Sequence, residues 1–357
     1  MSTAAGGGVP RVRPTMRDVA ALAGLSIKTV SRVMNDAPSV APELATRVRN
    51  AADMLGYRPN LTASSLRRRD RRTATIGLLL EDVSNPFSAA LLRSIEDEAR
   101  ERGVELLIGS LDEDPDRERE LAQTLSDRQV DGLVIVPASR DQSYLFAERR
   151  RGVCVVFLDR MPRLFEADAV VSDNRGGAVA AVEHLLAGGH RRIGFLGDRL
   201  GIYTAAERYR GYELTLDRAG IPVEQSIIRS DLRTVETAAQ ATSDLMAQAH
   251  PPTALFASQN MVTIGAVQAL HRLDLQHSVA LIGFDDFPLA DSLEPGVTVI
   301  AQDTTGLGRL AAQRLFARLD GDQSPPGTFA LPTRMIERGS GEIRPATGLD
   351  RHRRTPR

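Results

Sequence analysis

The sequence is poor in several residue types, and each shortage excludes a class of protein. It has 1 cysteine and no tryptophan, so a disulfide within the chain is excluded. No apolar run reaches the roughly 18 residues of a membrane-spanning helix. The first fifteen residues lack the apolar core of a signal peptide, which predicts a cytoplasmic protein. Cys154 lies in the apolar run VCVVFL, which favours a buried structural thiol over a nucleophile.

The motifs of common enzyme chemistries are missing as well. The sequence has no GxxxxGK[ST] phosphate loop, no GxSxG elbow and no cysteines and histidines at zinc-binding spacing. Its 6 histidines are dispersed along the chain. These absences predict a protein that is not an enzyme and that needs no metal and no cofactor.

The charge of the chain is unevenly distributed. Residues 1–72 carry 13 arginines and lysines against 5 acidic residues, whereas the remainder carries 32 against 41. The basic N-terminal part therefore suits a polyanion, and the acidic remainder does not. A basic solvated surface without a partner would show the same balance, so the pattern of residues has to decide between the two.

The N-terminal part predicts three short helices. The stretch TMRDVAALAGLSIKTVSRVMN contains two of them, with Thr15 and Ser26 as N-caps and Gly24 in the turn between them. A third, amphipathic helix is expected over 42–55, and Gly56 ends it. This arrangement is typical of a helix-turn-helix domain.

The second of these helices would enter the major groove of DNA. Its apolar positions face the core, and its remaining residues are left to contact bases and phosphates. The candidate DNA-binding residues here are Ile27, Lys28, Thr29, Ser31 and Arg32. A small helical domain with no nucleic-acid role is the alternative that this pattern alone leaves open.

The stretches MRDVAALAGLSIKTVSRVMN and AADMLGYRPNLTASSLRR together resemble the DNA-binding headpiece of the LacI/GalR family of bacterial transcription regulators. The resemblance implies that residues 60–73 form a hinge helix that folds on the minor groove of a near-palindromic double-stranded operator. Leu66 matches the leucine that wedges into the central base step, and Ala63 matches the small residue where two hinge helices meet. Asn60 can cap this helix, and Arg67 begins an arginine run suited to phosphates.

From Thr75 onward, apolar runs alternate with amphipathic helical patterns, which predicts parallel sheets covered on both faces. The break near AVVSDNRGGA divides this part into two lobes, over about 75–171 and 172–300. The run VTVIAQ and the helix after it are expected to return to the first lobe, and PTRMIERGS to the second. The strands are expected at TIGLLL, VELLIGS, GLVIVPA, VCVVFLD, RIGFLGD, SIIRSD, TALFAS and VALIGFDD.

Polar residues follow many of these strands, where α/β sheets bind ligands. The region resembles the effector domain of the same family and the periplasmic ribose-type sugar-binding proteins. That resemblance implies a small-molecule effector, most simply a sugar, held by Asn85, Phe87, Asp159, Arg160, Arg208, Gln259, Asp285 and Gln302. Asp173 and Asn174 precede a helix and are expected to cap it or to bridge the lobes outside the site.

Several residues depart from the family pattern. Ser88 stands where sugar binders often have a second aromatic residue, and Gln259 and Asn260 replace the usual asparagine and aspartate. Ile202 occupies the place of an arginine in a purine-responsive member. These departures favour a neutral sugar over a purine. A sugar phosphate, a nucleoside and the absence of any effector stay open as alternatives.

The predicted organisation is an all-α helix-turn-helix headpiece with a hinge helix, followed by a two-lobed α/β domain of the periplasmic-binding-protein type. The segments are a tail (1–13), the DNA-binding domain (14–59), the hinge (60–73), the effector and dimerisation domain (74–340) and a second tail (341–357). That second tail lacks the leucine heptads through which tetramers of the family assemble, so a homodimeric repressor is expected. A constitutive DNA-architectural protein, or an enzyme or transport receptor on the same lobes, is the competing reading.

Overall fold

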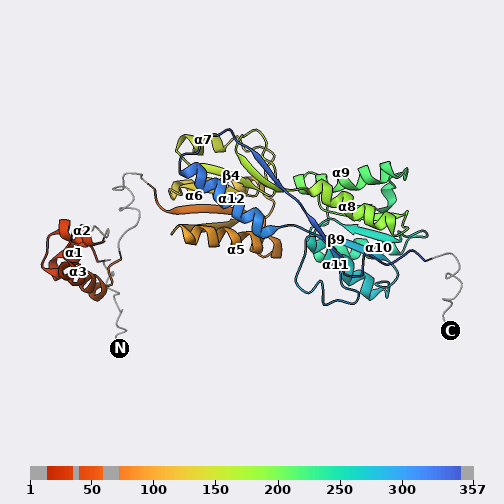
Figure 1. The fold of residues 1–357 in the computed structure, drawn as a ribbon, viewed down its shortest axis with the longest axis horizontal. Coiled ribbons are helices and arrows are strands. Elements are labelled where there is room, and N and C mark those ends of the chain that lie inside the picture. The colour runs from red at the N-terminus through yellow and green to blue at the C-terminus, as the bar shows by residue number, and fades with distance from the viewer. Residues whose placement is uncertain (1–13, 35–39, 59–71, 347–357) are drawn as a thin grey trace, which may run out of the picture. The chain divides into compact units, whose positions relative to one another are not determined.

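The structure is a computed structural model, and it describes residues 14–34, 40–58 and 72–346. These residues group into two compact units that divide between Thr73 and Ala74 (Figure 1). Each unit has its own hydrophobic core. Over the described residues, no helix combines the length and the apolarity that crossing a bilayer requires.

The first unit consists of three short helices, α1 (Met16–Ala23), α2 (Ile27–Met34) and α3 (Pro42–Leu55). The predicted caps are confirmed: Thr15 forms a capping box with Asp18, the Ser26 hydroxyl accepts a hydrogen bond from the Thr29 amide, and Gly24 and Gly56 end their helices in the left-handed conformation. The buried residues of the three helices form one small core: Val19, Ala20, Ala23, Val30, Val33, Val48, Ala51 and Ala52.

The second unit contains two six-stranded sheets, one in each lobe. The first sheet has the order β11-β5-β4-β3-β1-β2, and all of its strands are parallel. Its strands are β1 (Thr75–Leu80), β2 (Glu105–Ser110), β3 (Gly132–Ile135), β4 (Cys154–Leu158), β5 (Asp168–Ser172) and β11 (Thr328–Leu331).

The second sheet has the order β12-β10-β9-β8-β6-β7, and only β12 runs antiparallel to its neighbour. Its strands are β6 (Ile193–Leu196), β7 (Ile228–Arg229), β8 (Ala254–Ala257), β9 (Ala280–Phe284), β10 (Thr298–Ala301) and β12 (Arg334–Ile336). The central strands of both sheets are fully buried. This agrees with their continuous apolar runs, which predicted parallel sheets covered on both faces.

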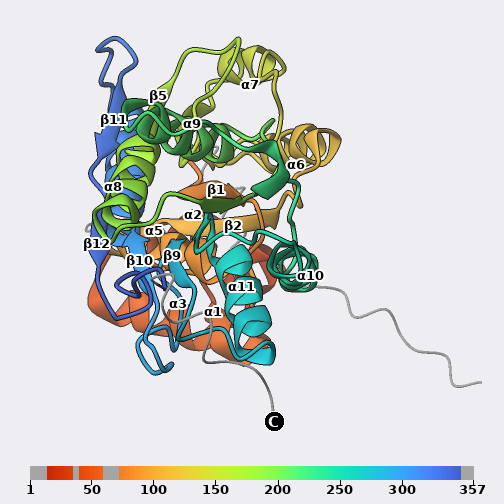
Figure 2. The same ribbon diagram turned by 90° about the vertical axis from the view of Figure 1, so that its right-hand side faces the viewer.

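Helices cover both faces of each sheet. Apolar residues of α5 and α12 pack on one face of the first sheet, and those of α6 and α7 pack on the other. In the second lobe α10 lies beside α11, and α8 lies beside α9 on the opposite face (Figure 2). The bounds are α5 (Pro86–Glu101), α6 (Pro115–Asp127), α7 (Leu145–Arg150), α8 (Asn174–Ala187), α9 (Tyr203–Arg218), α10 (Val235–Met246), α11 (Asn260–Arg272) and α12 (Thr304–Leu319).

One part of the predicted lobe assignment is wrong. The run VTVIAQ contains β10, which pairs with β9 in the second sheet and does not return to the first lobe. The helix after it, α12, does return and packs against α5, as the blue helix beside the orange one in Figure 1 shows. The prediction that PTRMIERGS joins the second lobe is confirmed by the pairing of β12 with β10. The strands β5 and β11 were not predicted.

The chain crosses between the lobes three times, after β5, after β10 and between β11 and β12. The first two crossings are built alike. Asp173 caps α8 and accepts a hydrogen bond from the Gly176 amide at 2.8 Å, and Asp303 caps α12 through the Gly306 amide at the same distance. Each crossing strand therefore leads directly into a firmly capped helix of the other lobe.

Candidate nucleic-acid interface and effector site

The exposed face of α2 carries the residues that the sequence singles out for DNA. Val30 and Val33 are buried in the core of the first unit, while Ile27, Lys28 and Arg32 are exposed. Thr29 and Ser31 are half-buried between the two groups. The helix therefore offers one apolar and two cationic side chains on its solvent side, which is a surface suited to base edges and phosphates.

A long-range contact fixes the turn before α2. The Arg47 guanidinium, from α3, donates from Nε at 3.1 Å and from Nη2 at 2.6 Å to the carbonyl oxygen of Ala23. Ala23 is the last residue of α1, so this cation satisfies a carbonyl that the helix end leaves without a partner. The predicted hinge residues Asn60, Ala63, Leu66 and Arg67 lie outside the described residues, and their roles stay predictions.

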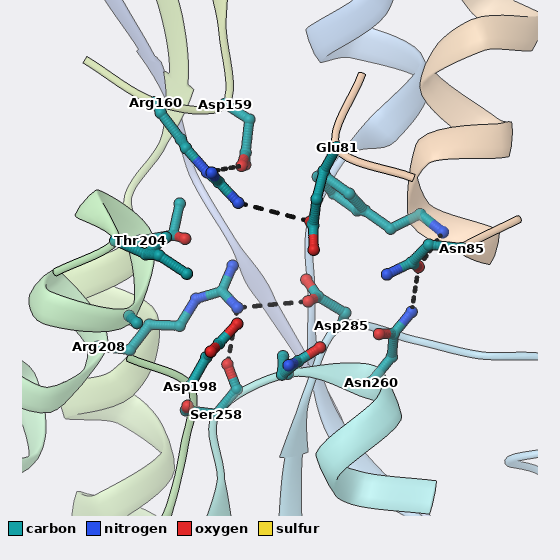
Figure 3. A pocket seen from close by; sticks show the side chains of 14 residues that line it. Glu81, Asn85, Asp159, Arg160, Asp198, Thr204, Arg208, Ser258, Asn260 and Asp285 are labelled. Carbon is teal, nitrogen blue, oxygen red and sulfur yellow. Dashed lines mark hydrogen bonds and ion pairs between the residues drawn. The ribbon is translucent and has the colours of Figure 1, made fainter. Parts of the chain in front are cut away.

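The candidate effector site is a cavity between the two lobes of the second unit (Figure 3). Its volume is about 40 Å³, room for only a few water molecules. A ligand as large as a sugar ring therefore needs the lobes to part or side chains to move. The cavity is lined by Glu81, Asn85, Phe87, Asp159, Arg160, Asp198, Ile202, Thr204, Ala205, Arg208, Ser258, Gln259, Asn260 and Asp285.

Arg208 organises the second-lobe side of this cavity. Its Nε donates to the Asn174 side-chain oxygen and its Nη1 to the Ser258 carbonyl oxygen, each at 2.7 Å. The same Nη1 lies 3.3 Å from a carboxylate oxygen of Asp285. The guanidinium also lies 3.8 Å above the centre of the Phe284 ring. A buried arginine with this many partners holds one orientation, so the groups it leaves exposed to the cavity are preorganised.

Asp285 is the second anchor of this side. One of its oxygens faces Arg208, and the other accepts a hydrogen bond from the Gln302 amide at 2.5 Å. Gln302 does not line the cavity itself. It follows β10 at the second crossing and supports Asp285 from behind.

Arg160 organises the first-lobe side. It is buried, and its guanidinium pairs with Glu113 at 2.5 Å, with Glu81 at 3.4 Å and with Asp159 at 3.7 Å. Burial raises the pKa of Glu81 to about 7, against the attraction of Arg160. Burial also raises the pKa of Asp159 and that of Asp198. Four carboxyl groups and two arginines line the cavity, so acidic groups outnumber basic ones there.

Several buried polar atoms around the cavity lack a hydrogen-bond partner. They belong to both lobes and include acceptors and donors: Asp159 Oδ1, Arg160 Nε, Ser258 Oγ and Gln302 Oε1. A buried polar atom without a partner costs free energy, and such atoms concentrate where a ligand supplies the missing bonds. This set fits a ligand with several hydroxyl groups.

The two lobes touch each other at one edge of the cavity. The side-chain oxygen of Asn85 caps α5 through the Phe87 amide at 3.0 Å and accepts a second bond from the Asn260 amide of the other lobe at 2.7 Å. Phe87 is half-buried and lines the cavity beside this contact. The Gln259 amide donates to the Leu232 carbonyl at 3.4 Å. If the lobes part at this edge of the cavity, the hydrogen bond between Asn85 and Asn260 breaks.

The structure thus gathers seven of the eight residues expected at this site around one cavity, with Gln302 behind it. The sequence reasoning missed others, of which Glu81 and Asp198 each follow an apolar strand and carried the same signal as Asp159. Asp173 is a helix cap as expected. Asn174 was expected outside the site, but its buried side chain holds Arg208. No local pattern reveals that contact, because it joins residues from two different helices.

Comparisons with known proteins agree with both units. Residues 15–60 match the family model described as bacterial regulatory proteins, lacI family, and residues 182–341 match a periplasmic binding protein-like domain. The HTH-type transcriptional regulator DegA of Bacillus subtilis is 30% identical over 336 residues, which covers 92% of this chain and 98% of the relative. The ribose operon repressor of Escherichia coli is 31% identical over 329 residues, covering 91% and 99%.

A solved structure shows the same similarity in three dimensions. The complex of the transcriptional regulator CelR with cellobiose is 28% identical to this chain, with a TM-score of 0.68. The match covers 92% of this chain and all of the other. The similarity therefore extends over both units of the sequence.

Proposed function

Because the chain belongs to the LacI family of bacterial regulatory proteins, we propose that it represses transcription by binding a near-palindromic operator as a homodimer under the control of a sugar. The α2 helix of each subunit reads one half-site in the major groove, and a closed dimer matches the two-fold symmetry of such a site. The hinge segments kink the centre of the operator from the minor groove.

The observation that carries the effector half of this proposal is the buried Arg208 with its partners, facing unpartnered polar atoms of the opposite lobe. Carboxylates and amides can accept and donate hydrogen bonds to neighbouring hydroxyl groups of a sugar, and arginine can donate to them. The Phe87 ring supplies an apolar wall for the C–H face of the sugar ring. The cellobiose in the CelR complex and the ribose in the name of the relative support this class of ligand.

The charge of the cavity supports a neutral group there over a phosphate. The carboxyl groups outnumber the arginines, and both arginines already face carboxylates within 3.4 Å. A phosphate would have to displace one of these pairs and lie beside the remaining carboxylates. Ile202, an apolar residue in the lining, gives a purine no charged partner.

Effector and operator are coupled through the relative position of the lobes. A ligand bridging Asp159 and Arg208 favours one arrangement of the lobes, and a different arrangement of the first lobes in the dimer orders or releases the hinge. The coupling is reciprocal, so an effector that weakens operator binding is itself bound more weakly by the operator complex.

The test uses the full chain in two assays. A thermal-shift screen against pentoses, hexoses, disaccharides, sugar phosphates and purines identifies ligands of the folded state. A duplex selected from a random library then serves as the operator in fluorescence anisotropy. We expect a neutral sugar to raise the melting temperature and to change operator affinity. Arg208→Ala is expected to lose both responses and to keep operator binding.

Arg210→Ala is the matched control, because Arg210 lies on the same helix but is exposed and pairs with Glu207 outside the cavity. It should keep both responses. A sugar response that survives in Arg208→Ala would show that the effector binds elsewhere. Operator binding without a response to any compound would favour a constitutive DNA-binding protein, and turnover of a sugar would favour an enzyme.

A further inference from the structure

A second cavity lies next to the candidate effector site. It has a volume of about 590 Å³, within the roughly 300–1,000 Å³ of typical ligand pockets. Arg160 and Ile202 line both cavities, so the two are adjacent compartments of one interlobe space. We call the larger one the vestibule. Its first-lobe wall comes from the segments that follow β2, β3 and β4, and its second-lobe wall from residues 199–203.

The vestibule differs from the inner cavity in charge. Its lining contains four arginines and two carboxyl groups, whereas the inner lining contains two arginines and four carboxyl groups. Arg160 is already paired with Glu113. The arginines that set the character of the vestibule are therefore Arg140, Arg163 and Arg199.

Two buried polar side chains hold the backbone that carries Arg140 and Arg163. Gln142 is fully buried, and its amide donates to the Ser139 carbonyl at 2.7 Å and accepts from the Arg163 amide at 2.6 Å. Glu118 is also fully buried and accepts hydrogen bonds from the backbone amides of Ala138 and Ser139 at 2.6 and 2.7 Å. The two arginines thus project from a wall that is fixed before any ligand arrives.

The opposite wall brings Arg199 and Tyr203. Arg199 Nε has no hydrogen-bond partner and lies 3.7 Å from a carboxylate oxygen of Asp231. Tyr203 lies half-buried in the same lining and offers a ring for stacking. Arg140 reaches across to this wall, because its Nη2 atom occupies the space that a Cβ at Gly201 would need. Arginines from both lobes therefore meet over one space.

We propose that the vestibule is a second subsite, which binds the anionic part of an effector made of two units. A neutral sugar unit occupies the inner cavity, and a carboxylate or phosphate on the second unit binds Arg140, Arg163 and Arg199. This inference rests on the proposed sugar effector and adds its charge and its size. The inner cavity, with its excess of carboxyl groups, then holds only the neutral unit of such a ligand.

Matched ligands test the subsite by isothermal titration of the full chain. The probes are lactose, cellobiose and maltose, each compared with its aldobionic acid and with its 6′-phosphate. Hydrogen bonds to charged groups are stronger than neutral ones by about 1 kcal/mol or more, so an anionic probe should bind roughly 5-fold or more tightly than its neutral parent. The aldobionic acid and the phosphate separate the two sources of negative charge. The advantage should shrink as salt is added.

Variants locate the anion. We expect the advantage of the anionic probe to disappear in Arg163→Gln and in Arg199→Gln, each tested alone and in combination with Arg140→Gln. The affinity of these variants for the neutral disaccharide should stay within about twofold of the wild-type affinity. Arg150→Gln is the matched control, because Arg150 is an exposed arginine of the first lobe outside the vestibule lining. It should retain the full advantage.

Three results would overturn the subsite. Neutral disaccharides that bind as well as their acids would remove the charge preference while leaving the sugar effector intact. An advantage that persists in the vestibule variants would place the anion elsewhere. If none of the probes and no free monosaccharide binds the wild-type protein, both this inference and the proposed effector fail together.

Discussion

Asp159 and Asp285 occupy equivalent places in the two lobes. Each follows a central strand and has a left-handed backbone, with φ of 65° and 69°. The amide of Asp159 donates to the Val170 carbonyl at 2.8 Å, and that of Asp285 to the Ile300 carbonyl at 2.9 Å, in both cases on the neighbouring strand. This conformation is uncommon outside glycine, and aspartate tolerates it better than most residues. The same strand end therefore aims one carboxylate into the cavity from each side.

The two aspartates are expected to respond differently to the same substitution. Asp285 is bonded to Arg208 and Gln302, whereas one oxygen of Asp159 has no partner. Asp285→Asn should lower the melting temperature by several degrees, because it leaves the buried Arg208 without its carboxylate. For a domain of this size, each kcal/mol of lost stability lowers the melting temperature by about 2–4 °C. Asp159→Asn should leave the melting temperature unchanged or raise it.

Asparagine keeps the left-handed backbone at both positions, so the comparison isolates the side-chain charge. Thermal unfolding of both variants, without ligand, is the measurement. Equal destabilisation by the two substitutions would contradict the different roles assigned to them. The effector found in the thermal-shift screen should bind both variants at least about tenfold more weakly, because each loses a charged acceptor.

Glu81 predicts a pH dependence of stability. Its pKa in the folded protein is about 7, above the ordinary value of 4.5, because burial disfavours the charged form. The protonated carboxyl group therefore supports the folded state fully below about pH 4.5, and this contribution is lost as the pH rises through 7. Glu81→Gln, which stays neutral, should melt a few degrees above the wild type at pH 8.

The difference between Glu81→Gln and the wild type should shrink as the pH is lowered from 8 to 5. About a third of the Glu81 side chain is exposed, so solvent screening limits the effect to a few degrees. Differential scanning calorimetry across this pH range measures it. A difference that is constant with pH would show that Glu81 does not titrate in the range expected here.

The first unit depends on Arg47. Its two hydrogen bonds to the Ala23 carbonyl join a charged side chain of α3 to the end of α1. Arg47→Ala should cost about 1–3 kcal/mol, because it leaves a helix-terminal carbonyl without its partner. A domain this small has little stability in reserve. Residues 14–58 should therefore open more often and lose operator affinity.

Limited proteolysis of the full chain with chymotrypsin, which does not cut at arginine, reports this opening. Cleavage within the first unit should be faster in Arg47→Ala than in the wild type. Arg47→Lys keeps the charge but cannot donate twice in the same plane, so its cleavage rate should be intermediate. If Arg47→Ala were cleaved at the same rate as the wild type, the contact between Arg47 and the Ala23 carbonyl would add nothing to stability.

Leu66 is predicted to act only on a specific site. Leu66→Ala should weaken binding to the selected operator by a few kcal/mol at most and barely change binding to a random duplex, because only the specific complex inserts a wedge. Arg67→Gln is the contrasting variant, since loss of a phosphate contact should weaken binding to both duplexes. Fluorescence anisotropy at one salt concentration compares them. If Leu66→Ala weakened binding to both duplexes equally, Leu66 would not act as a wedge in the specific complex.

Local signals predicted most of the fold. The run TIGLLL coincides with β1, and the caps at Thr15 and Gly24 depend only on neighbouring residues. The strand β5 was not predicted because it begins with Asp168, and aspartate is more typical of loops than of buried strands. Its carboxylate is buried and binds Arg314 and Arg318 at 3.0 and 2.8 Å. Those partners come from α12, far along the chain, so the sequence around β5 contains no sign of them.

Lobe membership was the least predictable property. The strand β10 looks like any other buried strand, and its sheet is decided by pairing with β9. Site residues at strand ends could be predicted because they directly follow the apolar runs that mark the strands. Residues that hold other site residues, such as Asn174 behind Arg208, become visible only when the helices are packed.

The three crossings between the lobes also determine when the protein can fold during synthesis. The first sheet lacks its edge strand until residues 328–331 emerge, and the second lacks its own until residues 334–336 emerge. A nascent chain that stops at β10 therefore exposes β5 and β10 as open sheet edges, the kind of surface that aggregates. Contacts this distant in sequence also form slowly. A premature stop that removes only the last strands leaves both sheets incomplete, so we expect such a truncation to impair both halves of the effector site together.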